Sequence, residues 1–173
     1  MEKSHLYLVR HCESLGNHEN IFQGQLDLDI SATGEKQLAL LALRFRNIPI
    51  DAVYSSPLKR AYKTAEAVNL YHSLPIIKLP ELMEVDVGAL SGMKLDKAFA
   101  DYPVFAEKWQ NSPQNCIFPE GETTAEVYDR AKKALARVKA DCMGKTAVIT
   151  SHGFLLRCMA LSLIHISEPT RRS

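Results

Sequence analysis

The sequence predicts an α/β domain of three layers, in which a mostly parallel sheet carries helices on both faces. Short apolar runs typical of strands alternate along the chain with longer segments of helical period, as in folds built around parallel strands. The runs at residues 6–9 and 147–149 are wholly apolar, which is typical of strands buried on both faces. Both runs give way to polar residues that include a histidine. Ligands bind at this carboxyl edge of such sheets, so we expect the functional site there.

Length, charge and cysteine content exclude several classes of protein. The 173 residues suffice for one domain with a sizeable core. A formal net charge of +1 shows no bias toward nucleic acid or a membrane. The four cysteines lie far apart without a C-x-x-C pair, which indicates reduced thiols rather than a zinc or redox motif. Without a secretory signal or an apolar run of membrane-spanning length, we expect a soluble cytoplasmic protein with no nucleic-acid or membrane partner.

The first half of the chain predicts two strand–helix units and a third strand. Residues 16–29 are polar and predict a long loop over the end of the first strand. Ser31 can cap a helix with apolar residues at i, i+3, i+4 and i+7. A strand at residues 51–55 leads into a helix that begins near Pro57, since proline is tolerated in a first turn. Residues 76–79 predict the third strand.

The second half predicts loops and weak helices, followed by a clear helix, strand and helix. Residues 81–92 are acidic and glycine-containing, without a regular period, and predict a loop that lines a site. Residues 95–110 are weakly helical, with a break at Tyr102 and Pro103. Thr123-x-x-Glu126 fits a capping box. The last strand spans residues 146–150, and a helix follows from residue 154.

Charged side chains and histidines follow three of these strands. Arg10 and His11 follow the first strand, Arg60 lies in the first turn after the second, and His152 follows the last. If these strands are neighbours, two guanidinium groups, two imidazoles and a helix N-terminus meet at one edge. Such a cluster favours a dianionic group such as phosphate. Taken singly, each has a plainer explanation, because Arg60 could be a solvated surface charge and His152 a helix cap.

Several short blocks of such residues occur in a fixed order within residues 5–160. They are Arg10-His11-x-Glu13-Ser14-x-x-Asn17, Gln23-Gly24, Ser31-x-x-Gly34-x-x-Gln37, Ser55-Ser-Pro-Leu-x-Arg60, Glu81-Leu-x-Glu84-x-x-x-Gly88 and Ser151-His152-Gly153. In this order they resemble the histidine phosphatase superfamily, which includes phosphoglycerate mutases and many small phosphatases. Cys12 departs from the family's Arg-His-Gly signature, where glycine is usual. A side chain there could tilt the neighbouring histidine, so we expect an effect on rate rather than on reaction class.

The resemblance implies a role for each residue of the site. His11 would be the nucleophile that forms a phosphohistidine, and no metal or cofactor is needed where arginines supply the positive charge. Glu84 is implied as general acid and then as the base that activates water. Glu81, Asp86 and Glu13 are alternatives for that role. The residues expected to hold the phosphoryl group and substrate, with His152 protonated, are Arg10, Asn17, Gln23, Gly24, Arg60, His152 and Gly153.

Mutases and phosphatases share this machinery, and the sequence favours a phosphatase. The mutases of the family carry an Arg-x-Tyr-Gly element and further basic residues after the acid, whereas this chain has no arginine between Ala61 and Thr124. The same region offers aromatic residues for a lid over an organic group, or simply for the core: Phe99, Tyr102, Phe105 and Trp109. We therefore predict a hydrolase of small phosphorylated metabolites, of broad specificity or similar to alpha-ribazole phosphatases. The alternatives are phosphoglycerate mutase-type transfer, a non-catalytic phosphate-binding protein and an inactive fragment.

The sequence near the C-terminus indicates a boundary between the domain and a tail. Residues 161–171 resemble the in-frame translation of a transposase adapter used in DNA library preparation. We therefore expect residues 1–160 to form a histidine phosphatase domain that is incomplete at its C-terminus, and residues 161–173 to be a non-native tail.

Overall fold

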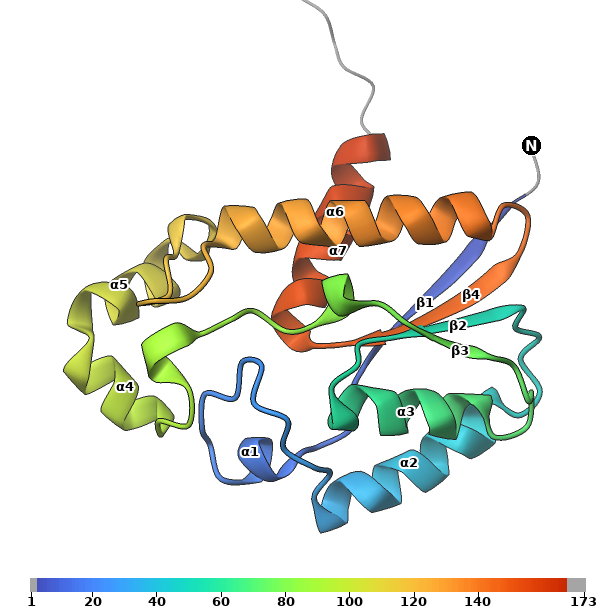
Figure 1. Ribbon diagram of the computed structural model, residues 1–173, viewed down its shortest axis with the longest axis horizontal. Coiled ribbons are helices and arrows are strands. Elements are labelled where there is room, and N and C mark those ends of the chain that lie inside the picture. Colours follow the sequence, from blue (N-terminus) through green and yellow to red (C-terminus); the bar gives the residue numbers. More distant parts are fainter. Residues whose placement is uncertain (1–2, 168–173) are drawn as a thin grey trace, which may run out of the picture.

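A parallel sheet forms the centre of the fold, and the computed structural model describes residues 3–167 of the chain. Within those residues the sheet has four strands in the order β1-β4-β2-β3 (Figure 1). The strands are β1 (His5–Arg10), β2 (Ala52–Ser55), β3 (Ile76–Lys78) and β4 (Thr146–Ser151). The predicted parallel sheet is confirmed.

Helices cover both faces of this sheet, which confirms the three-layer prediction (Figure 1). The longer ones are α2 (Ala32–Phe45), α3 (Lys59–Asn69), α6 (Thr124–Asp141) and α7 (Gly153–Ser167). Helices α2 and α3 pack on one face, and α6 and α7 pack on the other. No helix within residues 3–167 has both the length and the apolar character needed to cross a membrane.

Shorter helices connect these layers. They are α1 (Leu15–His18), α4 (Leu95–Asp101), α5 (Pro103–Asn111) and the 3-10 turns η1 (Pro80–Leu82), η2 (Gly88–Leu90) and η3 (Pro113–Asn115). The break between α4 and α5 falls at Tyr102, as predicted. The loop expected at residues 16–29 is wrong in part, because the last three residues of α1 lie in it. One turn shows no period in sequence, and a capping box of Ser14 and Asn17 forms it instead.

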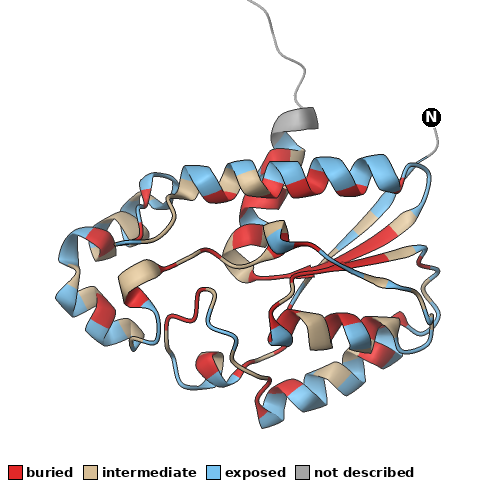
Figure 2. Cartoon of the chain, in the orientation of Figure 1, coloured by how far each residue is buried: buried red, intermediate tan, exposed pale blue. Residues whose placement is uncertain are grey.

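Strand β4 lies at the middle of the sheet, between β1 and β2, and is buried almost throughout (Figure 2). Its side chains alternate between the two cores: Ala147 and Ile149 face α6 and α7, whereas Val148 faces α2 and α3. A strand buried on both faces needs an apolar run, as the sequence provides.

The predicted caps are also present. Ser31 accepts a hydrogen bond from the Gly34 backbone at the start of α2, and Thr123 forms the capping box with Glu126 at the start of α6. Helix α7 continues across residue 161, where the tail was predicted to begin. Residues 168–173 of that tail lie outside the described residues, so a non-native tail remains a prediction.

We expect Gly34→Ala to destabilise the protein, although alanine favours helices over glycine. A Cβ at position 34 would lie 2.1 Å from the Glu13 carbonyl oxygen and 2.4 Å from an Ile30 methyl carbon. At Gly34, helix α2 thus packs directly against the backbone at Glu13, in the segment that follows β1. Overpacking should lower the free energy of unfolding by about 1–3 kcal/mol, measured by urea denaturation.

The exposed Lys36→Ala on the same helix is the matched control, with an expected change within about 0.5 kcal/mol. A Gly34→Ala protein as stable as the wild type would contradict the close approach.

Candidate active site

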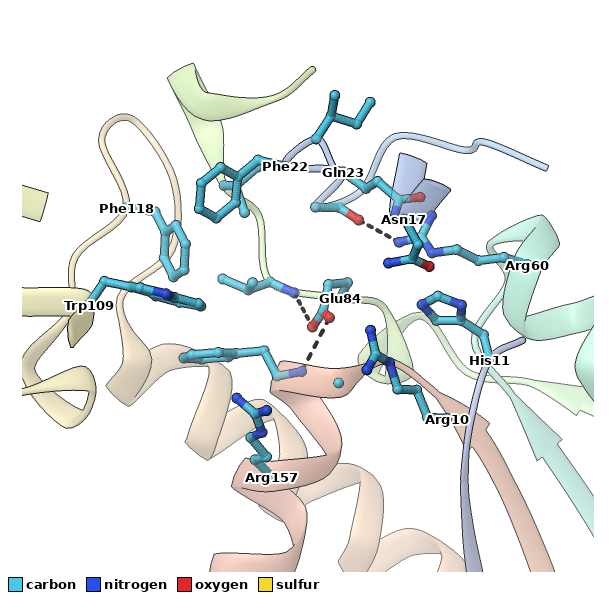
Figure 3. A pocket seen from close by; sticks show the side chains of 16 residues that line it. Arg10, His11, Asn17, Phe22, Gln23, Arg60, Glu84, Trp109, Phe118 and Arg157 are labelled. Atoms are coloured by element: carbon cyan, nitrogen blue, oxygen red, sulfur yellow. Dashed lines mark hydrogen bonds between the residues drawn. The ribbon is translucent and has the colours of Figure 1, made fainter. Parts of the chain in front are cut away.

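A cavity opens at the carboxyl edge of the sheet and gathers most of the predicted site residues (Figure 3). The predicted residues that line it are Arg10, His11, Asn17, Gln23, Gly24, Arg60, Glu84 and Gly153. The strand register explains why these residues lie close together. Arg10 pairs with Ser151 of β4, and Ser55 of β2 pairs with Thr150. The residues that follow these three strands are therefore side by side at one edge, as the sequence predicts.

His11 presents one ring nitrogen to the cavity in its unprotonated form. Its Nδ1 lies 2.7 Å from the Cys12 carbonyl oxygen, which can only accept, so Nδ1 carries the hydrogen and Nε2 keeps its lone pair. Burial, together with the charges of Arg60 and Arg10, lowers the pKa of His11 to about 4, against the opposing effect of the hydrogen bond to Cys12. A neutral imidazole with a free Nε2 at neutral pH is the form that attacks phosphorus.

Cys12 fixes this arrangement through its backbone. Its N–H donates to Thr64 Oγ1 at 3.0 Å, and that hydroxyl donates to the Arg60 carbonyl oxygen at 2.7 Å. Cys12 is not among the residues of positive φ, so the backbone here does not require glycine. The backbone conformation thus gives no reason for a tilt of the nucleophile, and an effect of the Cys12 side chain on rate stays a prediction. Burial raises the pKa of the Cys12 thiol.

Arg60 is a buried cation, with an exposed fraction of 1%. Its Nη1 donates to the Leu26 carbonyl oxygen at 2.6 Å and its Nη2 to the Gly24 carbonyl oxygen at 2.7 Å. Burial lowers its pKa to about 10, against the opposing effect of Glu84 and Asp27. The side chain therefore stays charged at neutral pH. This excludes the solvated surface charge, and it gives Arg60 a second task that the sequence did not predict, which is to hold the loop at residues 24–26.

His152 lies behind His11 rather than in the cavity lining. The two ring centroids are 5.2 Å apart, and the exposed fraction of His152 is 0%. Its Nε2 lies 2.8 Å from Ser56 Oγ, while Nδ1 has no hydrogen-bond partner among the described residues. Burial, then the charges of Arg60 and His11, lower the pKa of His152 well below its ordinary value. Without a bound anion these effects favour a neutral His152, and the protonated form expected with a bound phosphoryl group stays a prediction.

The loop residues are fixed by a polar network under the cavity. Asn17 Oδ1 accepts the Ser14 N–H at 3.1 Å, and Gln23 Oε1 accepts from Ser14 Oγ at 2.7 Å. Gly24 has a φ of +47°, and a Cβ there would lie 2.7 Å from a Val87 methyl carbon. Glycine is thus required at position 24 for conformation and for space.

Glu84 faces His11 across the cavity and is held at the N-terminus of α7 (Figure 3). Its Oε1 accepts the N–H groups of Val85 at 3.0 Å and Leu155 at 3.2 Å, and its Oε2 accepts the Phe154 N–H at 3.2 Å. A helix N-terminus suits a carboxylate because its first N–H groups lack partners within the helix.

The alternative carboxylates lie elsewhere. Glu81 and Asp86 are absent from the cavity lining, and Asp86 Oδ1 instead accepts the Gly88 N–H at 2.9 Å. Glu13 lines an adjoining hollow, and its Oε1 accepts from Ser31 Oγ at 2.6 Å. Glu84 is therefore the one of these four that lines this cavity with His11. The described residues hold no group of three or more His, Cys, Asp and Glu side chains placed to bind a metal ion.

The far end of the cavity has an aromatic wall that the sequence predicted only in part. Trp109 lines it as expected, whereas Phe99, Tyr102 and Phe105 pack in the core instead. The lining residues that sequence reasoning missed include Phe22, Phe118, Phe154 and Arg157. The Trp109 and Phe154 rings stack with centroids 5.7 Å apart. Phe154 and Arg157 follow the Ser-His-Gly block at helical spacing, and this was the signal that could have located them.

A family model described as "Histidine phosphatase superfamily (branch 1)" matches residues 6–173. The chain belongs to the histidine phosphatase superfamily. This agrees with the site, in which a neutral histidine, two arginines and a carboxylate surround one cavity.

Similar proteins include phosphatases. Phosphoserine phosphatase 1 from Hydrogenobacter thermophilus is 38% identical, over 93% of this chain and 76% of its own length. Among solved structures, Bacillus stearothermophilus YhfR superposes with a TM-score of 0.89 and 27% identity, over 96% of this chain and 85% of its own. The alpha-ribazole phosphatase from Shigella flexneri has a TM-score of 0.82 and 26% identity, over 95% and 80% of the two chains. These relatives support phosphomonoester hydrolysis of the histidine phosphatase type.

The lowered pKa of His11 predicts a loss of stability in acid. The pKa is about 4 in the folded chain and 6.5 in the unfolded one, so below pH 6.5 the unfolded chain binds more protons and gains stability relative to the fold. Each unit of difference corresponds to about 1.4 kcal/mol. We expect the free energy of unfolding to fall less steeply between pH 6.5 and 4.5 in His11→Gln than in the wild type.

Urea denaturation at several pH values gives this slope. The exposed His5→Gln is the control and should keep the wild-type slope. Equal slopes in His11→Gln and the wild type would show that folding does not perturb this histidine.

Proposed function

We propose that the chain hydrolyses small phosphomonoesters in two steps through a phosphohistidine at His11. In the first step, His11 Nε2 forms a bond to phosphorus, the ester P–O bond breaks, and the leaving oxygen takes a proton from Glu84. In the second step, Glu84 removes a proton from water, the water oxygen attacks phosphorus, and the N–P bond breaks. Inorganic phosphate and free His11 result, and Glu84 is protonated again.

One observation carries this proposal: a neutral His11 and the Glu84 carboxyl group face each other across a cavity that Arg10 and Arg60 also line (Figure 3). Phosphoryl transfer depends mainly on positioning and on stabilising the charge of the transferred group. Two permanently charged guanidinium groups supply that charge without a metal ion. His152, packed against the His11 ring at 5.2 Å between centroids, orients the nucleophile and can be protonated once a dianion is bound.

We propose a substrate with an organic group larger than the phosphate itself. The aromatic wall of Phe22, Trp109, Phe118 and Phe154 would cover such a group, and Arg157 stands beside it. A broad-specificity or alpha-ribazole phosphatase-like activity fits this wall, and the Shigella flexneri relative supports it. The four cysteines are free and buried, which supports a reducing cytoplasmic setting.

The reaction predicts turnover of p-nitrophenyl phosphate that survives EDTA and is lost in His11→Ala. Loss of the nucleophile should lower kcat by at least about a thousandfold, because the covalent route then disappears. The measurement is steady-state release of p-nitrophenolate, together with trapping of labelled phosphoenzyme by acid quench.

Four outcomes would contradict the proposal. Loss of activity with EDTA would exclude the metal-free mechanism, and labelled phosphoenzyme in His11→Ala would exclude the nucleophile. Binding of vanadate without any turnover would favour the non-catalytic phosphate-binding alternative. Transfer of phosphate between positions of phosphoglycerate, faster than its release to water, would favour the mutase.

The aromatic wall predicts size-dependent selectivity. Trp109→Ala should raise KM for 1-naphthyl phosphate by about ten- to thirtyfold, because roughly 1.5–2 kcal/mol of apolar burial is lost. KM for ethyl phosphate, which does not reach the wall, should change little. Tyr71→Ala removes a half-exposed aromatic residue outside the cavity lining and is the control. Equal effects of Trp109→Ala on both substrates would show that this ring only supports the core.

A further inference from the structure

The segment that carries Glu84 has no regular secondary structure of its own. It lies between η1 and η2, from Met83 to Val87. The position of the Glu84 carboxylate therefore depends on groups that reach this segment from other elements.

Arg130 on α6 is the main group that does so. Its Nη1 donates to the carbonyl oxygens of Glu81 at 3.0 Å and Met83 at 2.7 Å, and its Nη2 donates to that of Glu84 at 3.3 Å. Its Nε and Nη2 also donate to the two carboxylate oxygens of Glu122, at 2.9 Å and 2.7 Å. One side chain thus holds three backbone carbonyl groups within residues 81–84 and a fixed anion.

Glu122 holds the other side of Glu84. Its Oε2 accepts the Asp86 N–H at 2.8 Å, and its own backbone N–H donates to the Asp86 carbonyl oxygen at 2.9 Å. Together, Arg130 and Glu122 grip the main chain both before and after the carboxylate. Their side chains are 18% and 23% exposed, so the pair is largely withdrawn from water.

Only arginine can make this set of contacts. Its guanidinium offers five N–H groups in a rigid planar fork, whereas lysine has three donors on one flexible atom. An arginine kept only for charge would not need to direct three N–H groups at carbonyl oxygens. The arrangement is built to fix a backbone path.

We propose that Arg130 and Glu122 are positioning residues for Glu84. The inference rests on the proposed function, in which Glu84 protonates the leaving group. Neither residue lines the cavity, so neither touches the reacting atoms. They fix the backbone from which the Glu84 carboxylate projects, and with it the distance from that carboxylate to the leaving oxygen.

A positioning role of this kind has a kinetic signature. A displaced acid slows phosphoryl transfer only when the leaving group needs a proton. Phenyl phosphate needs one, because phenolate is a basic leaving group, whereas 2,4-dinitrophenolate leaves without a proton. A residue that merely stabilises the fold would affect both substrates alike.

The experiment compares kcat/KM on these two substrates, since this parameter reports the transfer to the enzyme. We expect Arg130→Lys to lower kcat/KM about ten- to a hundredfold on phenyl phosphate, and by less than about threefold on 2,4-dinitrophenyl phosphate. Glu84→Gln should show the same selectivity with a larger effect. The inhibition constant of inorganic phosphate should stay at its wild-type value, because Arg10, His11 and Arg60 are untouched.

Arg137→Lys is the matched control, since Arg137 lies on the same helix and is exposed. If Arg130→Lys does not fold, Glu122→Gln is measured instead, because it leaves the guanidinium on the backbone but weakens its second anchor. Thermal unfolding of each variant shows that the fold is retained.

The outcomes separate the two proposals. Suppose that Glu84→Gln lowers kcat/KM mainly on phenyl phosphate, whereas Arg130→Lys and Glu122→Gln lower kcat/KM on both substrates equally or on neither. The positioning inference is then overturned, and the proposed function stands. If Glu84→Gln lowers kcat/KM on both substrates equally, Glu84 is not the general acid, and the positioning inference fails with that assignment. A larger loss of kcat/KM on phenyl phosphate than on 2,4-dinitrophenyl phosphate, in Glu84→Gln and in the positioning variants alike, confirms the positioning role.

Discussion

The parallel pairing of β4 with β1 on one side and β2 on the other is the constraint on which the site depends. It places the ends of three strands next to one another, and with them His11, Ser56 and His152. Backbone groups continue the pairing past the strands, since the His11 N–H donates to the Ser151 carbonyl oxygen and the Ser56 N–H to that of Thr150. A slip of one residue would turn every side chain of β4 to the opposite face. The register is therefore set by the two apolar cores as well as by hydrogen bonds.

Buried positive charge determines the chemistry at this edge. Arg60 is enclosed by the fold and held by the carbonyl oxygens of the loop that covers the site. Burial, and then the charge of Arg60, keeps His11 and His152 neutral. An anion that enters the cavity meets the positive charges of Arg60 and Arg10, and a neutral nucleophile lies beside them. Burial of the cation is thus costly for folding but useful for binding a dianion.

The acid side of the cavity is built differently from the nucleophile side. His11 projects from the end of a strand, whereas Glu84 projects from an irregular segment between two 3-10 turns. Its carboxylate is held by the first N–H groups of α7, and its backbone by Arg130 of α6. Helices α6 and α7 pack against each other on one face of the sheet. The distance between acid and nucleophile is therefore a consequence of how that helical layer sits on the sheet.

The sequence by itself determined the strands, the longer helices and most of the residues that share the cavity. Apolar runs and helical periods are local signals, and Arg10, His11, Arg60 and His152 follow strands whose ends must meet in a parallel sheet. The sequence did not determine the protonation state of His152, because the pKa of this side chain depends on burial and on charges from three other segments. The aromatic wall and the Arg130 network also required the tertiary structure. Their members lie on separate elements, and no spacing along the chain records that Arg130 reaches the backbone of Glu84 across 46 positions.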